Sequence, residues 1–231
     1  MRVYAAYADG LRIVDPEAGS VETRLSGQRV ECLSVVDAGP DGSGESGNAD
    51  AAREADPQRV LAGTSEAGLF RSVDGGERFA RAAAPTLGPE GCGPDAVTAV
   101  ATSPHDPAVV WVGTEPSRAY RSADGGETVT RVDGLADVSS ASEWSFPPRP
   151  DTHHVRWIEP SPSDPHRWLL GIEAGALVVT PDGGETWTDR PPGARRDTHA
   201  MATHSGAPDR VYAAAGDGFA ESDDRGDSWR V

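Results

Sequence analysis

The segment Thr180-Pro181-Asp182-Gly183-Gly184-Glu185-Thr186-Trp187 decides the fold of this chain, because closely similar segments occur three more times. The other copies begin at Ser72, Ser122 and Ser222. The central aspartates of the four copies are Asp74, Asp124, Asp182 and Asp224, which lie 50, 58 and 42 residues apart. Repeats with periods of about 20 to 50 residues are typical of propeller blades and solenoid units. The spacing therefore predicts a repeat architecture.

Each copy has the chemistry of a tight turn. The aspartate can accept hydrogen bonds from backbone N–H groups of its own turn, and the glycines can adopt a positive φ. The pattern Ser/Thr-x-Asp-x-Gly-x-Thr-Trp resembles the Asp-box, or BNR repeat, of sialidases, sortilin-type receptors, some xyloglucan-cleaving glycosidases and photosystem II assembly factors. The resemblance implies a structural role for the four aspartates, on the face of a propeller away from its binding site. It identifies a blade rather than a reaction.

A weaker repeat lies upstream of each copy and contains Pro and Asp, as in Ser103–Pro107 and Ser161–Pro165. Such turns join strands. Short runs rich in β-forming residues flank them, for example Val97–Ala101 before the turn and Val109–Thr114 after it. Together these runs predict four short antiparallel strands per repeat, which is one blade of an all-β propeller.

The repeats predict a single propeller domain of about five blades. Residues 27–83, 95–134, 152–192 and 197–231 each supply a four-stranded blade, and residues 1–26 hold three strands, over Arg2–Ala8, Gly10–Val14 and Val21–Leu25. The first blade thus lacks its innermost strand, and Val231 falls inside the last strand of the fifth. The ring is therefore expected to be incomplete: an open or strained arc, an arc completed by a partner, or part of a longer propeller. The last is favoured, since an exposed inner edge promotes aggregation.

Composition suggests a high-salt cytoplasm. The chain has 37 acidic and 21 basic residues, a formal charge of −16, and no lysine. This usage indicates a halophilic cytoplasmic protein, in which carboxylates maintain solubility. The absence of a basic stripe disfavours nucleic acid as a partner, and no apolar run suggests a membrane span or signal peptide. Cys32 and Cys92 form no metal or redox motif. Residues 38–55, rich in Gly, Ser and Asp, are expected to be a disordered acidic insertion that is dispensable.

The segment Ser139–His154 differs from a passive linker, since it combines aromatic, proline, histidine and arginine residues, and loops commonly carry function. Aligning the blades places the starts of inner strands at the mouth of the propeller, opposite the Asp-boxes. In this alignment Asp151-Thr152-His153 matches Asp197-Thr198-His199. The residues expected to converge there are Asp95, Asp151, His153, Asp197 and His199, with Arg149, Arg156, Arg195 and Arg196 around them and Asp9, Glu66, Glu115, Glu173 and Asp217 on the outer loops.

Three functions are compatible with this mouth. A divalent metal could be held by His153, His199, Asp151 and Asp197, because imidazole and carboxylate ligands suit Zn, Mn or Fe. A glycoside hydrolase, sialidase-like in its Asp-boxes, could use Asp95, Asp151 or Asp197 together with Glu173 as its carboxyl pair. The Phe/Tyr-Arg-Ile-Pro signature of sialidases is absent, however, and their arginine triad cannot be assigned.

The third function, a non-catalytic binding or scaffold propeller, requires the least and is the favoured interpretation. Its partner would be an unknown protein or a small polar ligand such as a glycan. The candidate ligand-binding residues are Trp144, Phe146, Arg149, His153, His154, Arg156 and His199. For Trp144 and Phe146 the alternative is packing over the ring, with the histidines bonded locally.

Overall fold

The computed structural model describes residues 2–37, 58–83, 96–149 and 151–231. These residues form 18 strands in five antiparallel sheets, and within each sheet every strand pairs with the next one in sequence. The first two sheets comprise β1 (Val3–Tyr7), β2 (Gly10–Asp15) and β3 (Ser20–Arg24), then β4 (Val30–Asp37), β5 (Gln58–Thr64), β6 (Gly68–Ser72) and β7 (Ala80–Arg81). The third comprises β8 (Ala96–Thr102), β9 (Val110–Glu115), β10 (Ala119–Ser122) and β11 (Thr130–Val132).

The fourth sheet comprises β12 (Val155–Pro160), β13 (Trp168–Ile172), β14 (Ala176–Thr180) and β15 (Thr188–Asp189). The fifth comprises β16 (Thr198–Thr203), β17 (Val211–Ala215) and β18 (Gly218–Ser222). Two single-turn 3₁₀ helices, Leu135–Asp137 and Ala141–Glu143, lie between the third and fourth sheets. In the described part of the chain, no helix is long and apolar enough to cross a membrane.

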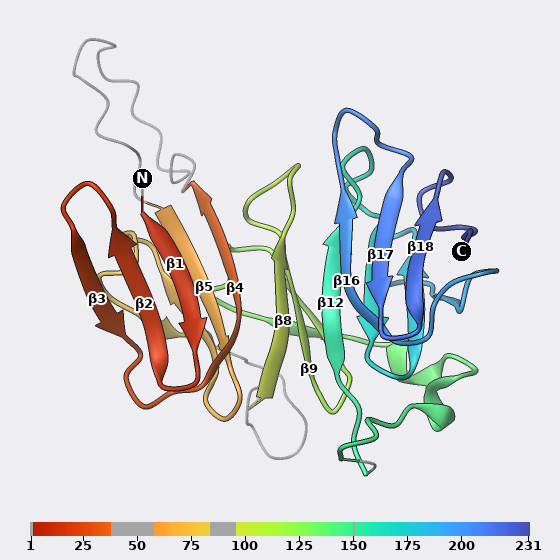
Figure 1. The fold of residues 1–231 in the computed structure, drawn as a ribbon, viewed down its shortest axis with the longest axis horizontal. Helices are drawn as coiled ribbons and strands as arrows, with labels where there is room; N and C mark the ends of the chain where they lie inside the picture. Colours follow the sequence, from red (N-terminus) through yellow and green to blue (C-terminus); the bar gives the residue numbers. More distant parts are fainter. Residues whose placement is uncertain (1, 38–57, 84–95, 150) are drawn as a thin grey trace.

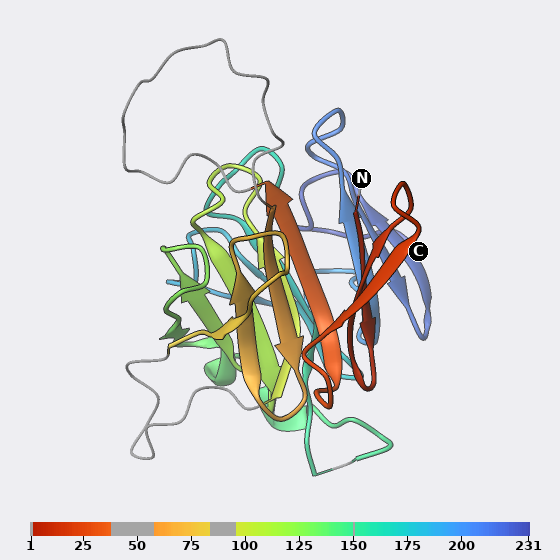
Figure 2. The same ribbon diagram turned by 90° about the vertical axis from the view of Figure 1, so that its left-hand side faces the viewer.

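The five sheets stand side by side in an open arc. The first strands of the last four sheets, β4, β8, β12 and β16, contact one another in that order and form the inner side of the arc. Figure 1 shows the β1–β3 sheet and the β16–β18 sheet at opposite ends of the longest axis. In Figure 2 the middle sheets lie to the left of both end sheets, so the row of sheets is curved. The predicted all-β propeller class, with five blades and no closed ring, is confirmed.

The four repeated segments form turns with one hydrogen-bond scheme, here called the repeat turns (72–79, 122–129, 180–187 and 222–229). In the third, Oδ1 of Asp182 accepts hydrogen bonds from the Thr180 hydroxyl (3.0 Å) and the Thr186 N–H (2.8 Å). Its Oδ2 accepts from the Thr186 hydroxyl at 2.5 Å. The Thr180 hydroxyl in turn accepts the Gly184 N–H at 2.7 Å. The motif therefore satisfies its own polar groups, which is why it recurs with so little variation.

The repeat turns also join neighbouring sheets. Trp187 packs edge-on against Trp111 of the preceding sheet, with ring centroids 6.1 Å apart, and its indole N–H donates to the Asp133 carbonyl at 3.1 Å. Trp111 itself stacks on Trp168 at 5.3 Å. Gly226 has a φ of +89°, and a Cβ there would lie 2.5 Å from Leu169. Burial between blades therefore supplies the core, and glycine is required where the turn meets the preceding sheet.

Two sequence predictions require comment. The fifth blade, expected to have four strands, has three named strands, and an isolated bridge between Glu221 and Arg230 stands where the fourth would begin. The first sheet has the three strands expected, with β1 at its inner edge. The predicted insertion at 38–55, Cys92 and Asp95 lie outside the described residues.

Candidate functional site

A cleft of about 780 Å³ lies where the inner strands begin, on the face of the arc opposite the repeat turns. It is built from the starts of β4, β8 and β12, from the turns that follow β5, β9 and β13, and from the loop before β12. Its lining residues are Arg29, Glu31, Ser65, Glu66, Ala96, Thr98, Glu115, Pro116, Phe146, Arg149, Thr152, His154, Arg156 and Glu173. Three consecutive blades therefore contribute to one surface, as the blade alignment predicts for the mouth.

Each inner strand has a β-bulge near its start, which directs one side chain toward this surface. Each of the four strands β4, β8, β12 and β16 has a register shift at its second or third residue, so that one residue is skipped in the pairing with the next strand. The skipped residues are Glu31, Thr98, Arg156 and His199. A β-bulge leaves one residue unpaired and redirects its side chain. The first three of these residues line the cleft, and His199 contacts Glu173 beside it.

This register corrects the alignment made from sequence. The pairing places His199 in the position of Arg156, because each is skipped between two residues paired with the neighbouring strand. His153 therefore does not share the position of His199. The match of Asp151-Thr152 with Asp197-Thr198 aligned His153 with His199. In the structure the bulge of the fourth blade lies three residues later, at Arg156, and the two dipeptides carry no signal of this offset.

Three carboxylates of the cleft contact basic side chains of the same surface. The Arg29 guanidinium lies 2.6 Å from Glu31, and Arg149 lies 2.7 Å from Glu115. His154, which is buried, has its Nε2 at 2.8 Å from Oε2 of Glu173, and Arg156 Nε is 3.5 Å from the same oxygen. Acidic and basic side chains are thus paired at three places in the cleft.

The loop before β12 divides its aromatic residues between the core and the cleft. Trp144 is only 6% exposed, belongs to the core of the third and fourth sheets, and donates its indole N–H to Ser140 at 2.9 Å. Phe146 instead lines the cleft, with its ring edge-on to His154 at 4.9 Å and the Arg149 guanidinium 5.2 Å from its centroid. One of the two aromatic candidates therefore has access to a ligand, and the other packs.

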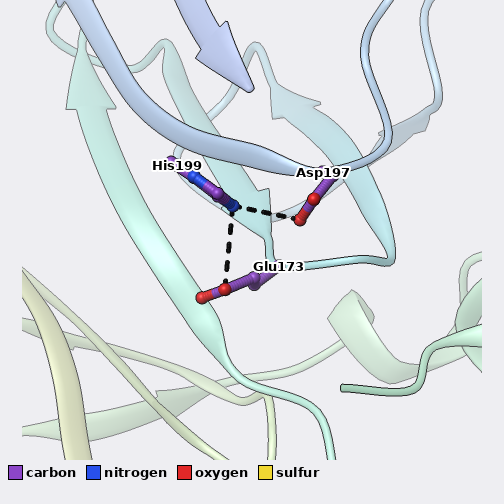
Figure 3. Close-up of side chains that lie close together, drawn as sticks. All are labelled: Glu173, Asp197 and His199. Atoms are coloured by element: carbon purple, nitrogen blue, oxygen red, sulfur yellow. Dashed lines mark ion pairs between the residues drawn. The ribbon is translucent and has the colours of Figure 1, made fainter. Parts of the chain in front are cut away.

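Glu173, Asp197 and His199 form a compact group at one end of the cleft (Figure 3). Glu173 follows β13, Asp197 precedes β16, and His199 lies on β16. His199 Nε2 is 3.3 Å from Oδ1 of Asp197 and 3.7 Å from Oε1 of Glu173, and the three ligand atoms lie within 4.8 Å of one another. Among the described residues this is the group of His, Cys, Asp and Glu able to hold a metal ion.

His153 and Asp151 do not belong to this group. Nδ1 of His153 accepts the Ser117 N–H at 3.3 Å, and its ring packs edge-on against Trp144 at 5.5 Å. Burial, reinforced by the neighbouring His154, lowers the pKa of His153. A histidine kept neutral and bonded in this way anchors the loop. Asp151 is exposed in the turn before β12, and Asp95 lies outside the described residues.

Sequence reasoning missed Arg29, Glu31 and Thr98 as cleft residues. The signal was present as a weak pattern, since the residue that follows the first buried side chain of each inner strand lines the cleft or lies beside it: Val30-Glu31, Val97-Thr98, Val155-Arg156 and Thr198-His199. Strict alternation along a strand would assign these side chains to one face without distinguishing them from their neighbours. The bulge makes them special, and it is visible only in the pairing.

No family model matches this chain, and no curated protein matches it. Solved structures do. An ancestral GH74 enzyme superposes with a TM-score of 0.55 at 17% identity, over 75% of this chain and 22% of its own. The extracellular domain of BT4673 from B. thetaiotaomicron gives 0.63 at 10% identity, over 96% and 26%. The computationally designed Ika8 protein gives 0.58 at 15% identity, over 100% and 57%.

These likenesses show the fold alone. The chain is an all-β, propeller-type protein. It spans about a quarter of the length of the first structures it matches.

Proposed function

We propose that this propeller is a non-catalytic binding protein that holds a hydroxyl-rich ligand, such as an oligosaccharide, in the cleft at the mouth of the arc. The observation that carries the proposal is a wide cleft lined by Phe146 and by carboxylates already engaged by basic side chains, Glu115 by the Arg149 guanidinium and Glu173 by a hydrogen bond with His154. Such pairs offer both donors and acceptors to hydroxyl groups without selecting a charged ligand.

The aromatic ring supports the same ligand class. A sugar ring presents a C–H face, and an exposed aromatic side chain supplies an apolar surface for it while polar groups fix its orientation. Phe146 is held in place by contacts with His154 and Arg149, so it is preorganised for such a contact. A ligand of this kind would extend along the inner strands, where a second hollow of about 510 Å³ shares Glu31, Thr98 and Arg156 with the cleft.

The test is isothermal titration calorimetry against a panel of neutral oligosaccharides, in buffer of high salt concentration. We expect Phe146→Ala and Arg156→Ala to weaken binding at least tenfold, a loss of about 1.4 kcal/mol. Arg131→Ala is the matched control, because Arg131 lies on the outer strand β11 and pairs with Asp133. Absence of sugar binding, or binding that Phe146→Ala and Arg156→Ala leave unchanged, would refute the proposal.

A second function, divalent-metal binding, is favoured by the group at Glu173, Asp197 and His199. One imidazole and two carboxylates suit Zn, Mn or Fe, and a site with three protein ligands leaves coordination positions open. The hydrogen bond from His154 to Oε2 of Glu173 leaves Oε1 on the side of His199. Such an outer contact is the kind that orients a ligand.

Metal binding is tested separately by titrating the chain with Zn²⁺ and Mn²⁺ and measuring retained metal and the melting temperature. His199→Ala should abolish retention, whereas His166→Ala, in an exposed turn at the opposite end, should not. Unchanged metal content in His199→Ala would exclude this site, and sugar binding could persist in either case.

The hydrolase alternative depends on the same carboxylates. Glu173 and Asp197 are the predicted carboxyl pair that the structure brings together. Both are engaged, Glu173 by His154 and Asp197 by the Ala174 N–H at 2.9 Å. An oligosaccharide that is hydrolysed by the wild type but not by Glu173→Gln or Asp197→Asn would overturn the non-catalytic assignment.

A further inference from the structure

Each end sheet of the arc leaves one face uncovered. In the fifth sheet, Val211 and Ala213 are buried against the fourth sheet, whereas Tyr212 and Phe219 point the other way and are 37% and 55% exposed. Their rings stack on each other with centroids 6.1 Å apart. Large exposed aromatic groups gathered on one sheet face mark an interaction surface.

The fourth sheet shows what covers this face elsewhere in the molecule. The strand pairing makes Leu169 of the fourth sheet equivalent to Tyr212 of the fifth. By the same pairing, Leu177 is equivalent to Phe219. Leu169 and Leu177 are 1% and 0% exposed, because the next sheet covers them with Val211 and Ala213. The exposed face of the fifth sheet is therefore equivalent to a face that another blade covers within the arc.

Polar groups at the edge of this face indicate the same arrangement. At the first interface of the arc, Arg2 and Tyr4 both donate to the Gly75 carbonyl in the repeat turn of the next sheet, at 3.3 and 2.9 Å. Arg210 and Tyr212 have the same identities and spacing on the fifth sheet, where Arg210 Nη1 lies 3.4 Å from the Tyr212 hydroxyl. A turn from a following blade would give this pair the acceptor that Arg2 and Tyr4 have.

The first sheet provides the matching surface. Residues 2–6 and 210–214 have the same sequence, Arg-Val-Tyr-Ala-Ala. Tyr4 packs toward the second sheet, so Val3 and Ala5 point to the opposite, uncovered face, and Val3 is 45% exposed. Val3 and Ala5 of the first sheet therefore correspond to Val211 and Ala213, the residues that cover the fourth sheet.

An acidic turn of the first sheet would approach Arg210, which within its own chain lies 3.5 Å from Asp223. The turn that joins β2 to β3 carries Asp15 and Glu17. By its place in the blade it corresponds to a repeat turn, the element that Arg2 reaches within the chain. If the first sheet of another copy takes the place of the blade after the fifth sheet, this turn lies near Arg210. Its carboxylates would then approach the Arg210 guanidinium.

We propose that a second copy of this chain completes the interface, with the β1–β3 face of each copy packed on the β16–β18 face of the other. Figure 1 shows the two faces at opposite ends of the arc, so they meet between molecules rather than within one. A contact between two different surfaces forms a closed assembly when the rotation brings both ends together. Two arcs then share two equal interfaces and enclose the inner strands of both.

The first experiment measures the mass of the purified chain by size-exclusion chromatography with light scattering, at micromolar concentration and high salt. The expected mass is twice 24.1 kDa. Phe219→Glu and Val3→Glu should each reduce it to that of one chain with an unchanged circular dichroism spectrum. Val73→Glu, which changes an exposed valine in a repeat turn, should leave it at two.

Complementation supplies the decisive control. A mixture of Phe219→Glu and Val3→Glu chains retains one intact pair of faces, so the mixture should form pairs although neither variant does so alone. A wild-type chain that is monomeric, a pair that survives Phe219→Glu, or a mixture that stays monomeric would overturn the proposal. A larger assembly sensitive to Phe219→Glu would overturn the two-copy arrangement.

Discussion

Replacing Asp182 by alanine should destabilise the protein by about 2 kcal/mol. The substitution removes the acceptor for three hydrogen bonds, from the Thr180 hydroxyl and from the N–H and hydroxyl of Thr186. Thr186 is exposed, so water can replace the hydrogen bonds that it loses, whereas Thr180 is fully buried and its hydroxyl has no such access to water. A buried group left without a partner costs about 1–3 kcal/mol, and a bond recovered by solvent costs about 0.5 kcal/mol or less.

The assay is urea unfolding at 25 °C, with Asp133→Ala as the control for loss of an exposed aspartate. Asp182→Asn keeps an amide oxygen for Thr180 and should lose only about half as much stability. In a double-mutant cycle, Thr180→Val and Asp182→Ala should couple by about 1 kcal/mol, because each removes the same bond. A loss below about 0.5 kcal/mol in Asp182→Ala, or complete additivity with Thr180→Val, would refute a hydrogen-bonding role for the repeat turn.

Three further outcomes are expected. Burial alone would raise the pKa of Asp224, but hydrogen bonds from Ser228 and Ser222 outweigh it and lower the pKa to about 2. The stability that the ionised Asp224 contributes is complete above the unfolded-state pKa of about 3.9 and is lost as the pH falls through about 2. The stability difference between wild type and Asp224→Asn should therefore shrink over that window. A constant difference from pH 5 to 2 would contradict the shift. Gly226→Ala should lower the melting temperature by several degrees, since a Cβ would lie 2.5 Å from Leu169 at a φ of +89°, and calorimetry showing no change would exclude that clash. Raising KCl into the molar range should raise the melting temperature, because a formal charge of −16 repels itself less when screened; a melting temperature independent of salt would remove the basis for a halophilic origin.

The sequence was sufficient for the parts of the structure that depend on local chemistry. The repeat turns are self-contained hydrogen-bond motifs, so Asp74, Asp124, Asp182 and Asp224 could be recognised, and the blades followed from their spacing. The convergence of Glu173, Asp197 and His199 was partly predictable, because blade geometry brings strand starts and outer loops to one end.

The errors concern features that depend on pairing or packing. His153 and His199 share a local pattern, but the β-bulges assign them to different positions, and register is a property of two strands rather than one. Trp144 and Phe146 are two residues apart in a loop, and only the tertiary packing distinguishes the buried Trp144 ring from the half-buried Phe146 ring that lines the cleft. Such distinctions are not encoded in composition or spacing.

The bulge shared by the inner strands has a consequence for engineering. Glu31, Thr98, Arg156 and His199 occupy one equivalent position in four successive blades, and none belongs to the buried core. The side chains of Glu31, Arg156 and His199 are thus separate from the hydrophobic packing that forms the arc, whereas the Thr98 hydroxyl donates to the Val155 carbonyl of the next sheet at 2.7 Å. A combinatorial library randomised at Glu31, Arg156 and His199, with Thr98 kept, should retain the fold in most members while changing ligand selectivity, so the arc can serve as a scaffold with interchangeable contacts in three of its blades.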